Sequence, residues 1–245
     1  MKIKHLLLIF SILSIQSVFG QHTVRKELYQ AFLSRNIKKW ESMTLKVEQN
    51  TNFNKTADLL QLIHCYYGWT SELLDSKQYK KAETNIVKAE KWIDKILAKE
   101  PNNALAVNYK GVFISYRIPY NKTKAMTLEK QSKQLIKKAL ALNPSNAQIL
   151  FDNGNAYYYP PKLFGGNKKT ALSYYQKAIS ILEKQKNTNG NWMYVQLLML
   201  EARCNDLLGN LESAKKGYEK TLRTEPNFKI VRDKYYPELQ KQLTK

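Results

Sequence analysis

The feature that most constrains the fold of this chain is a set of markers repeated at fixed spacing. Pro101 and Pro144 are each followed ten residues later by a glycine, Gly111 or Gly154. Small and aromatic residues also recur at steps of four and three, as Ala171, Tyr175 and Ala178 in one unit and as Ala214, Tyr218 and Thr221 in another. A helix pair that is reused along a chain predicts an all-α solenoid of stacked pairs.

Apolar residues within these units follow helical periodicity between start and stop signals. The segment Tyr79 to Lys99 carries one apolar stripe, formed by Ala82, Ile86, Ala89, Ile93 and Ile96. Pro101 predicts the end of that helix, and Asn103 is placed to cap the next one. The same signals predict one domain over residues 21–245, with helix pairs at about 22–50, 56–100, 102–143, 145–186 and 191–225 and a C-terminal cap at 227–245.

The spacing resembles that of the tetratricopeptide repeat (TPR) family, whose unit is a helical hairpin with small residues where its helices cross. The fifth unit carries the resemblance best, in its small residue, turn, crossing alanine, aromatic and closing proline, which are Ala202, Gly209, Ala214, Tyr218 and Pro226. The third and fourth units depart from the pattern because inserts separate their helices. The resemblance implies a right-handed solenoid of antiparallel helix pairs, with irregular inserts and terminal capping helices.

The insert from Pro160 to Asn167 resembles one found in exported bacterial TPR proteins. Some of those proteins are similar to the helical components of periplasmic solute-uptake systems. The resemblance therefore implies two functions. One is a scaffold that binds a protein or peptide partner. The alternative is an accessory subunit of an envelope transport or assembly complex, held by its outer faces and contacting a small solute.

In TPR folds the first helix of each pair lines a concave groove, and the resemblance implies such a groove here. Tyrosine offers rigid apolar area with a hydroxyl, and amide side chains add hydrogen bonds, so the lining suits a peptide. Any single tyrosine has the alternative role of filling a gap between repeats. The expected lining residues are Tyr67, Ser71, Asn108, Ser115, Tyr116, Gln148, Phe151, Asn155, Tyr158, Tyr159, Gln196 and Arg203.

The N-terminus predicts export. Lys2 and Lys4 precede the apolar run Leu6 to Ile15, which is typical of a signal peptide over residues 1–20 that is cleaved near Gly20. An uncleaved anchor is the weaker alternative, because the run is shorter than the ~20 apolar residues of a spanning helix. We expect a periplasmic or secreted protein with no transmembrane segment in its mature chain, and peripheral contact with envelope components stays open.

The net charge of +20 raises the question of a polyanionic partner. The lysines recur at helical spacing, for example at Lys80, Lys88 and Lys95, which is typical of the solvated face of amphipathic helices. No basic–aromatic recognition motif is present. The sequence therefore favours a solvated basic surface, and we expect no nucleic-acid partner.

The residues needed for catalysis or metal binding are scarce. Beyond the predicted signal peptide only His22 and His64 remain, and His64 is expected in the core. Aspartates and glutamates are expected on exposed helix faces. We expect no enzyme activity, no cofactor and no metal site.

The glycine pair in the insert and the two cysteines each allow two interpretations. Gly165 and Gly166 followed by Asn167 could cradle an anion at a helix N-terminus, but a sharp turn capped by Asn167 is favoured. Cys65 and Cys204 could form a disulfide in an oxidising compartment. Buried free thiols are favoured, because both cysteines have apolar neighbours and helices of distant repeats in a solenoid rarely touch.

Overall fold

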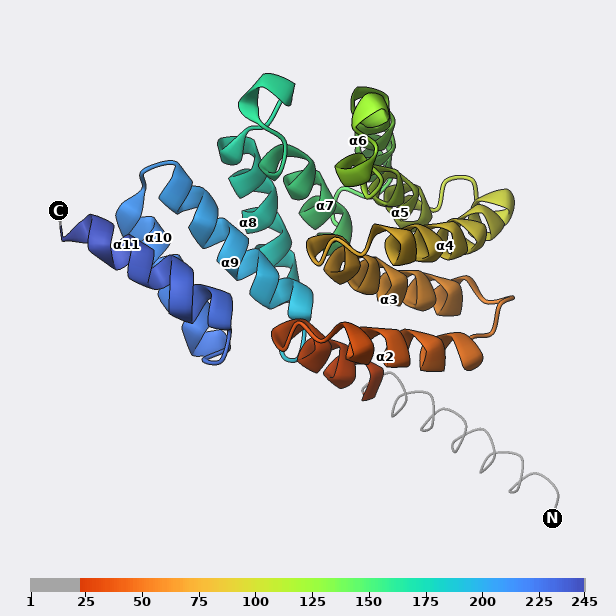
Figure 1. Ribbon diagram of the computed structural model, residues 1–245, viewed down its shortest axis with the longest axis horizontal. Helices are drawn as coiled ribbons and strands as arrows, with labels where there is room; N and C mark the ends of the chain where they lie inside the picture. The colour runs from red at the N-terminus through yellow and green to blue at the C-terminus, as the bar shows by residue number, and fades with distance from the viewer. Residues whose placement is uncertain (1–22, 245) are drawn as a thin grey trace, which may run out of the picture.

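The computed structural model describes residues 23–244, and all regular secondary structure in this range is helical (Figure 1). The helices follow one another as stacked pairs, which confirms the all-α solenoid expected from the sequence. The pairs are 23–33 with α2 (Ile37–Gln49), α3 (Thr56–Asp75) with α4 (Tyr79–Lys99), α5 (Ala104–Ser115) with α6 (Ala125–Leu142), α7 (Ala147–Tyr158) with α8 (Lys168–Lys184), and α9 (Trp192–Leu207) with α10 (Leu211–Thr224). The chain continues into π-helical η4 (Val231–Tyr235) and α11 (Tyr236–Leu243).

Three short 3-10 turns occupy the inserts. They are η1 (Ile118–Tyr120) and η2 (Lys122–Lys124) between α5 and α6, and η3 (Lys162–Phe164) between α7 and α8. The π-helical η4 changes to α11 at Tyr236, and Pro237 lies in the first turn of α11.

Asparagine side chains fix where five of the helices begin. Each accepts a hydrogen bond from a backbone N–H two or three residues further on, and the five are Asn36, Asn103, Asn146, Asn167 and Asn191. Such a cap stabilises a helix by about 1 kcal/mol. The caps at Asn103 and Asn167 are two that the sequence predicts.

Glycines at the helix crossings let neighbouring helices approach closely. A Cβ atom added at Gly154 would lie 2.3 Å from Cε1 of Tyr175 on the partner helix, and one at Gly217 would lie 2.8 Å from the Cβ of Ala202. Real Cβ atoms do not come this close, so larger residues at these positions would push the helix axes apart.

The solenoid is curled so tightly that distant repeats touch. The inner helices α3, α5 and α7 lie side by side. Trp192, at the start of α9, stacks on His64 of α3 with ring centroids 5.3 Å apart and contacts Tyr67 at 6.1 Å. The assumption that helices of distant repeats do not touch is therefore wrong, because the curvature brings the fifth pair back against the second.

The first helical segment, 23–33, reaches the last repeat as well. Phe32 packs between Trp192 and Phe228, with ring centroids at 5.5 and 5.4 Å, and the Tyr29 hydroxyl donates to Glu225 Oε2 at 2.8 Å. The Arg25 guanidinium donates to the backbone carbonyl of Gly190. The N-terminal pair thus closes one end of the inner face in addition to capping the solenoid.

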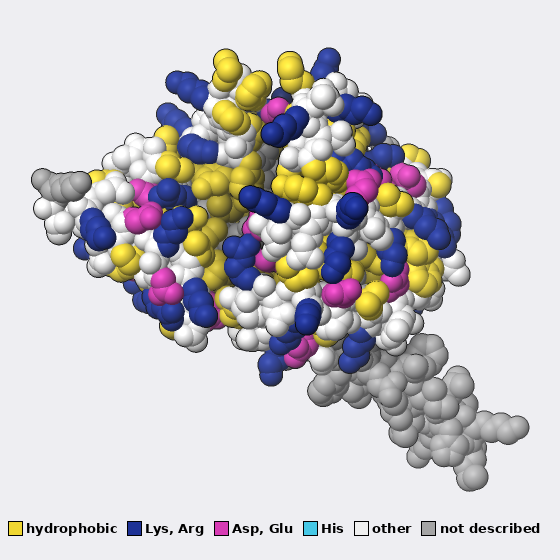
Figure 2. All heavy atoms as spheres, in the orientation of Figure 1, with side chains coloured by type: hydrophobic (Ala, Val, Ile, Leu, Met, Phe, Trp, Pro, Cys, Tyr) yellow, Lys and Arg dark blue, Asp and Glu magenta, His cyan; other side chains and the backbone are white. Residues whose placement is uncertain are grey.

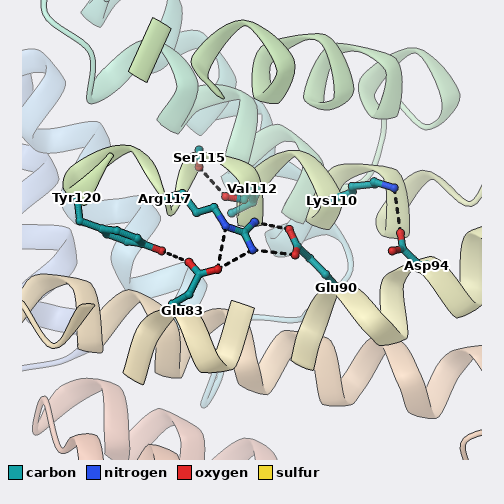
Figure 3. Close-up of polar contacts among 8 residues, drawn as sticks. All are labelled: Glu83, Glu90, Asp94, Lys110, Val112, Ser115, Arg117 and Tyr120. Atoms are coloured by element: carbon teal, nitrogen blue, oxygen red, sulfur yellow. Dashed lines mark hydrogen bonds and ion pairs between the residues drawn. The ribbon is translucent and has the colours of Figure 1, made fainter. Parts of the chain in front are cut away.

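The insert after α5 is tied to α4 by an ion-pair network (Figure 3). The Arg117 guanidinium donates to the Glu90 carboxylate at 2.5 and 2.9 Å and to Glu83 Oε1 at 3.0 and 3.2 Å. The Tyr120 hydroxyl donates to the other Glu83 oxygen at 2.6 Å. The network holds the third pair against the second at their exposed edge.

Cys65 and Cys204 are buried free thiols, as the sequence favours. Burial raises the pKa of each thiol to about 12, so neither is reactive as a thiolate near neutral pH. The predicted signal peptide, residues 1–20, lies outside the described residues. Within residues 23–244, no helix combines the length and apolarity needed to cross a membrane.

Candidate binding site on the inner face

The inner face of the solenoid is closed at one end and open at the other. Figure 2 shows the open part as a furrow with a largely hydrophobic floor, between the α8–α11 side of the molecule and the α2–α6 side. The closed end is where Trp192 meets α3 and the 23–33 segment covers it. The expected groove residues divide between these two environments.

Four of the expected groove residues are buried in the closed part. Asp152 Oδ1 accepts a hydrogen bond from the Tyr67 hydroxyl at 2.8 Å, and Oδ2 accepts from Asn108 Nδ2 at 2.6 Å and Gln148 Nε2 at 2.8 Å. Asp152 and its three hydrogen-bond donors are all buried, and the fourth groove residue, Phe151, is only 1% exposed. The groove assignment of Tyr67, Asn108, Gln148 and Phe151 is corrected accordingly. The tight curl turns these positions toward one another, so all four are buried and only Gln148 still borders a small pocket.

Asp152 is a buried carboxyl group that the sequence did not predict. From the sequence, aspartates and glutamates are expected on exposed helix faces. Burial raises the pKa of Asp152 to about 6, although the hydrogen bonds from Gln148, Asn108 and Tyr67 oppose that rise. The signal for it was its position on the same helix face as Gln148 and Asn155.

His64 lies at the edge of the same core and is partly buried. Its Nδ1 is 3.0 Å from the Tyr109 hydroxyl, and burial lowers its pKa to about 4, so the imidazole is neutral at pH 7. The core role expected for His64 fits this packing. Within residues 23–244 no group of three or more His, Cys, Asp or Glu side chains could hold a metal ion.

Most of the remaining expected residues come together around the open furrow, which we call the tyrosine cleft. Tyr158 and Tyr159 at the end of α7 pack edge to face with ring centroids 5.1 Å apart. Lys168 Nζ lies 4.2 Å from the centroid of the Tyr158 ring and donates to the Tyr158 carbonyl. The cleft is defined by Tyr116, Asn155, Tyr158, Tyr159 and Arg203, whereas Gln196 is partly buried in the first half of α9.

The far wall of the tyrosine cleft comes from α9 and η4. Gln196 and Arg203 lie four and eleven residues after Trp192, about one and three helical turns, which puts all three on one face of α9. The Arg203 guanidinium stacks over the Tyr235 ring at 4.8 Å and pairs with Asp206 at 2.5 Å. Arg203 is therefore held in one orientation with its cationic plane beside the cleft.

Tyr159 is the most accessible side chain of the cleft, with 64% of the residue exposed. Desolvation nevertheless raises its pKa, and Tyr158, Asp75 and Tyr235 raise it further. The Tyr159 residue is therefore open to water on one side, while Tyr158, Asp75 and Tyr235 lie near enough to act on its pKa. The ends of α3 and α7 and the η4 turn thus surround one exposed phenol.

The other members are partly buried at the floor. The Tyr116 hydroxyl donates to the Tyr67 carbonyl at 3.4 Å, and Asn155 Oδ1 accepts from the Tyr175 hydroxyl at 2.8 Å. Ser71 is partly buried on α3, one turn beyond Tyr67, and the Ser115 hydroxyl is used internally by the Val112 carbonyl. The cleft offers neutral phenols and a fixed guanidinium, which suits apolar and anionic groups of a ligand.

A smaller pocket of about 320 Å³ lies at the closed end of the inner face. It is lined by the 23–33 segment, the starts of α5, α7 and α9, and polar side chains that include Gln61, His64, Gln148 and Asn187. Its size fits a small polar molecule and is too small for a folded segment of another protein.

No family model and no curated protein sequence matches this chain. Among solved structures, it is similar to TTC0263, a thermophilic TPR protein of Thermus thermophilus, with TM-score 0.55 and 14% identity over 88% of this chain and 98% of that one. It is also similar to MamA protein (TM-score 0.42, 18% identity, 71% of this chain and 88% of that one). A third similarity is to the STAND protein with a tetratricopeptide repeat sensor from Pyrococcus horikoshii (TM-score 0.42, 17% identity, 88% and 31%). The likeness to TTC0263 supports a TPR-like fold and, at this identity, nothing finer.

Proposed function

We propose that the protein is a non-enzymatic, TPR-like scaffold that binds a protein or peptide partner in the tyrosine cleft. The exposure of Tyr159 carries the proposal: an aromatic ring projects into a concave space with 64% of the residue uncovered. Large aromatic side chains and arginine are enriched among the residues that dominate binding energy. Tyr158, Tyr159 and Arg203 supply both kinds of group in one cleft.

The chemistry of the cleft narrows the class of partner. Burial raises the pKa of Tyr158 to about 12, so its phenol stays neutral and offers a hydrogen bond. Lys168 lies over the Tyr158 ring in the cleft, and Arg203 lies over the Tyr235 ring beside it. The partner segment we propose therefore presents an apolar or aromatic side chain next to an acidic group or a free carboxylate.

The experiment is a quantitative pull-down from an envelope fraction of the source cells, with Tyr158→Ala/Tyr159→Ala as the test variant. Tyr157→Ala/Tyr174→Ala is the matched control, because this stacked pair (ring centroids 6.0 Å apart) lies outside the cleft. A partner retained by the wild type and the control and lost from the test variant supports the proposal. Equal recovery by all three proteins overturns it, provided that circular dichroism shows equal helicity.

The alternative is an accessory subunit of an envelope transport or assembly complex that contacts a small solute. The pocket of about 320 Å³ at the closed end is the observation that favours it. That function predicts co-purification with a membrane component that is insensitive to the Tyr158→Ala/Tyr159→Ala change. Export to the periplasm or medium is part of both proposals and rests on the sequence of residues 1–20 alone.

A further inference from the structure

Three large apolar side chains stand exposed outside the cleft, two in the η3 insert and one in the first turn of α6. Leu163 is 89% exposed and Phe164 is 48% exposed in the η3 insert, and Met126 is 75% exposed at the start of α6. Leu163, Phe164 and Met126 line the same shallow hollow, of about 460 Å³. Apolar groups gathered in this way on a protein surface mark a place of contact with another phase or molecule.

The insert holds Leu163 and Phe164 outward by its backbone. Gly166 makes the sharp return, since a Cβ there would lie 1.9 Å from the Pro160 carbonyl oxygen. The Asn167 N–H donates to the Tyr157 carbonyl at 2.9 Å, and Lys133 Nζ on α6 donates to the Phe164 carbonyl at 3.2 Å. The loop is thus tied at its base to α7 and at its tip to α6, with its apolar side chains left uncovered.

Three lysines, Lys130, Lys133 and Lys137, line the hollow together with these apolar side chains, and more lysines occur in the same two segments. Residues 118–142 and 159–169 contain nine lysines, no arginine and one acid, Glu129. The Glu129 carboxylate is already paired with Lys133 at 2.7 Å. Figure 2 shows yellow side chains at both tips at the top of the molecule with dark blue ones beside them. The nine are Lys122, Lys124, Lys130, Lys133, Lys137, Lys138, Lys162, Lys168 and Lys169, of which Lys168 is engaged with Tyr158 in the cleft.

We propose that this surface, the lysine-ringed tip, docks the protein onto the face of an anionic phospholipid bilayer. Leu163, Phe164 and Met126 would enter the headgroup region, and the lysines around them would lie at the level of the phosphates. Each lysine close to such a surface strengthens binding by about fivefold.

Two properties of the tip favour a bilayer over an acidic protein. Specific protein interfaces are enriched in arginine and depleted in lysine, and the tip has the opposite composition. Its apolar side chains also project from two separate elements, the η3 insert and the first turn of α6, which suits a deformable lipid surface better than a rigid partner. Since the insert follows Tyr159 directly, docking would hold the mouth of the tyrosine cleft next to the membrane.

The test is cosedimentation of the protein with sucrose-loaded vesicles of phosphatidylglycerol and phosphatidylethanolamine in roughly equal parts. Vesicles of phosphatidylcholine alone provide the uncharged comparison. The proposal expects binding to the anionic vesicles only, weakening as salt rises from about 0.05 to about 0.5 M. Leu163→Ala/Phe164→Ala should lower the partition coefficient at least about tenfold, and Lys122→Gln/Lys130→Gln/Lys137→Gln about a hundredfold.

Matched control variants test whether membrane binding depends on the tip residues in particular or on any exposed lysines and leucines. Leu207→Ala/Leu208→Ala removes two exposed leucines (47% and 40%) at the end of α9, and Lys80→Gln/Lys81→Gln/Lys184→Gln removes three exposed lysines elsewhere. Both controls should bind the anionic vesicles to within about twofold of the wild type. Absence of wild-type binding at low salt overturns the proposal, and so does a loss in the control variants equal to that in the tip variants. Neither result depends on partner capture by the tyrosine cleft.

Discussion

Replacing Asp152 by asparagine should remove a specific pH dependence of stability. The folded protein holds the Asp152 proton more tightly than the unfolded chain, because burial raises the carboxyl pKa from 3.8 to about 6. A carboxyl group whose folded pKa is raised contributes stability that is fully present below the unfolded pKa and is lost as pH rises through the folded pKa. The stability that Asp152 contributes is therefore lost between about pH 4 and about pH 6.

The size of the effect follows from the two pKa values of Asp152. A difference of about two pKa units, at ~1.4 kcal/mol each, corresponds to about 3 kcal/mol. The amide introduced by Asp152→Asn keeps the shape of the carboxyl group and cannot titrate. The free energy of unfolding of the wild type, minus that of Asp152→Asn, should fall by about 3 kcal/mol between about pH 4 and pH 6 and stay constant above.

The assay is urea unfolding followed by far-ultraviolet circular dichroism at a series of pH values for both proteins. Titration of groups common to both proteins, His64 included, cancels in the difference. Asp94→Asn is the control for the loss of one carboxylate, because Asp94 is an exposed residue that pairs with Lys110 at 2.9 Å. A wild-type minus Asp152→Asn difference that is flat, or that rises with pH, would refute the burial argument.

Three further substitutions test the packing by chemical denaturation. Gly154→Ala should destabilise the protein by about 2–3 kcal/mol, because its Cβ would overlap the Tyr175 ring; an unchanged midpoint would contradict the close crossing. Trp192→Ala should cost about 3–5 kcal/mol, since the indole joins α9 to α3 and to the 23–33 segment; a cost below ~1 kcal/mol would not fit. Arg117→Met should cost only about 1 kcal/mol, less at high salt, because Glu83 is partly solvated.

The local parts of the fold could be predicted from the sequence. The helix predicted from Tyr79 to Lys99 has those bounds, because an apolar stripe and a following proline act within a few residues of one another. The same holds for the cap at Asn103 and for the turn capped by Asn167. Each of these signals acts between residues that are close in the sequence and needs no contact with a distant helix.

The closed end of the inner face could not be predicted in this way. The contact of Trp192 with His64 depends on the curvature of the whole solenoid, which is the sum of small rotations at each helix interface. The burial of Asn108 and Asp152 follows from the same contact, since polar residues on an inner helix face line a groove or fill a core according to that curvature. Of the expected groove residues, those near the C-terminal ends of the inner helices border the open cleft.

The most direct test of the proposed function is site-specific photocrosslinking in the source cells. A photoreactive phenylalanine analogue is placed at Tyr159 in the cleft or at Val87, which is 56% exposed on α4 away from it. The proposal predicts a discrete protein adduct from position 159 that is lost when Arg203→Gln is added, and none from position 87. Adducts from position 87 alone, or no protein adduct from position 159, would contradict partner binding in the tyrosine cleft.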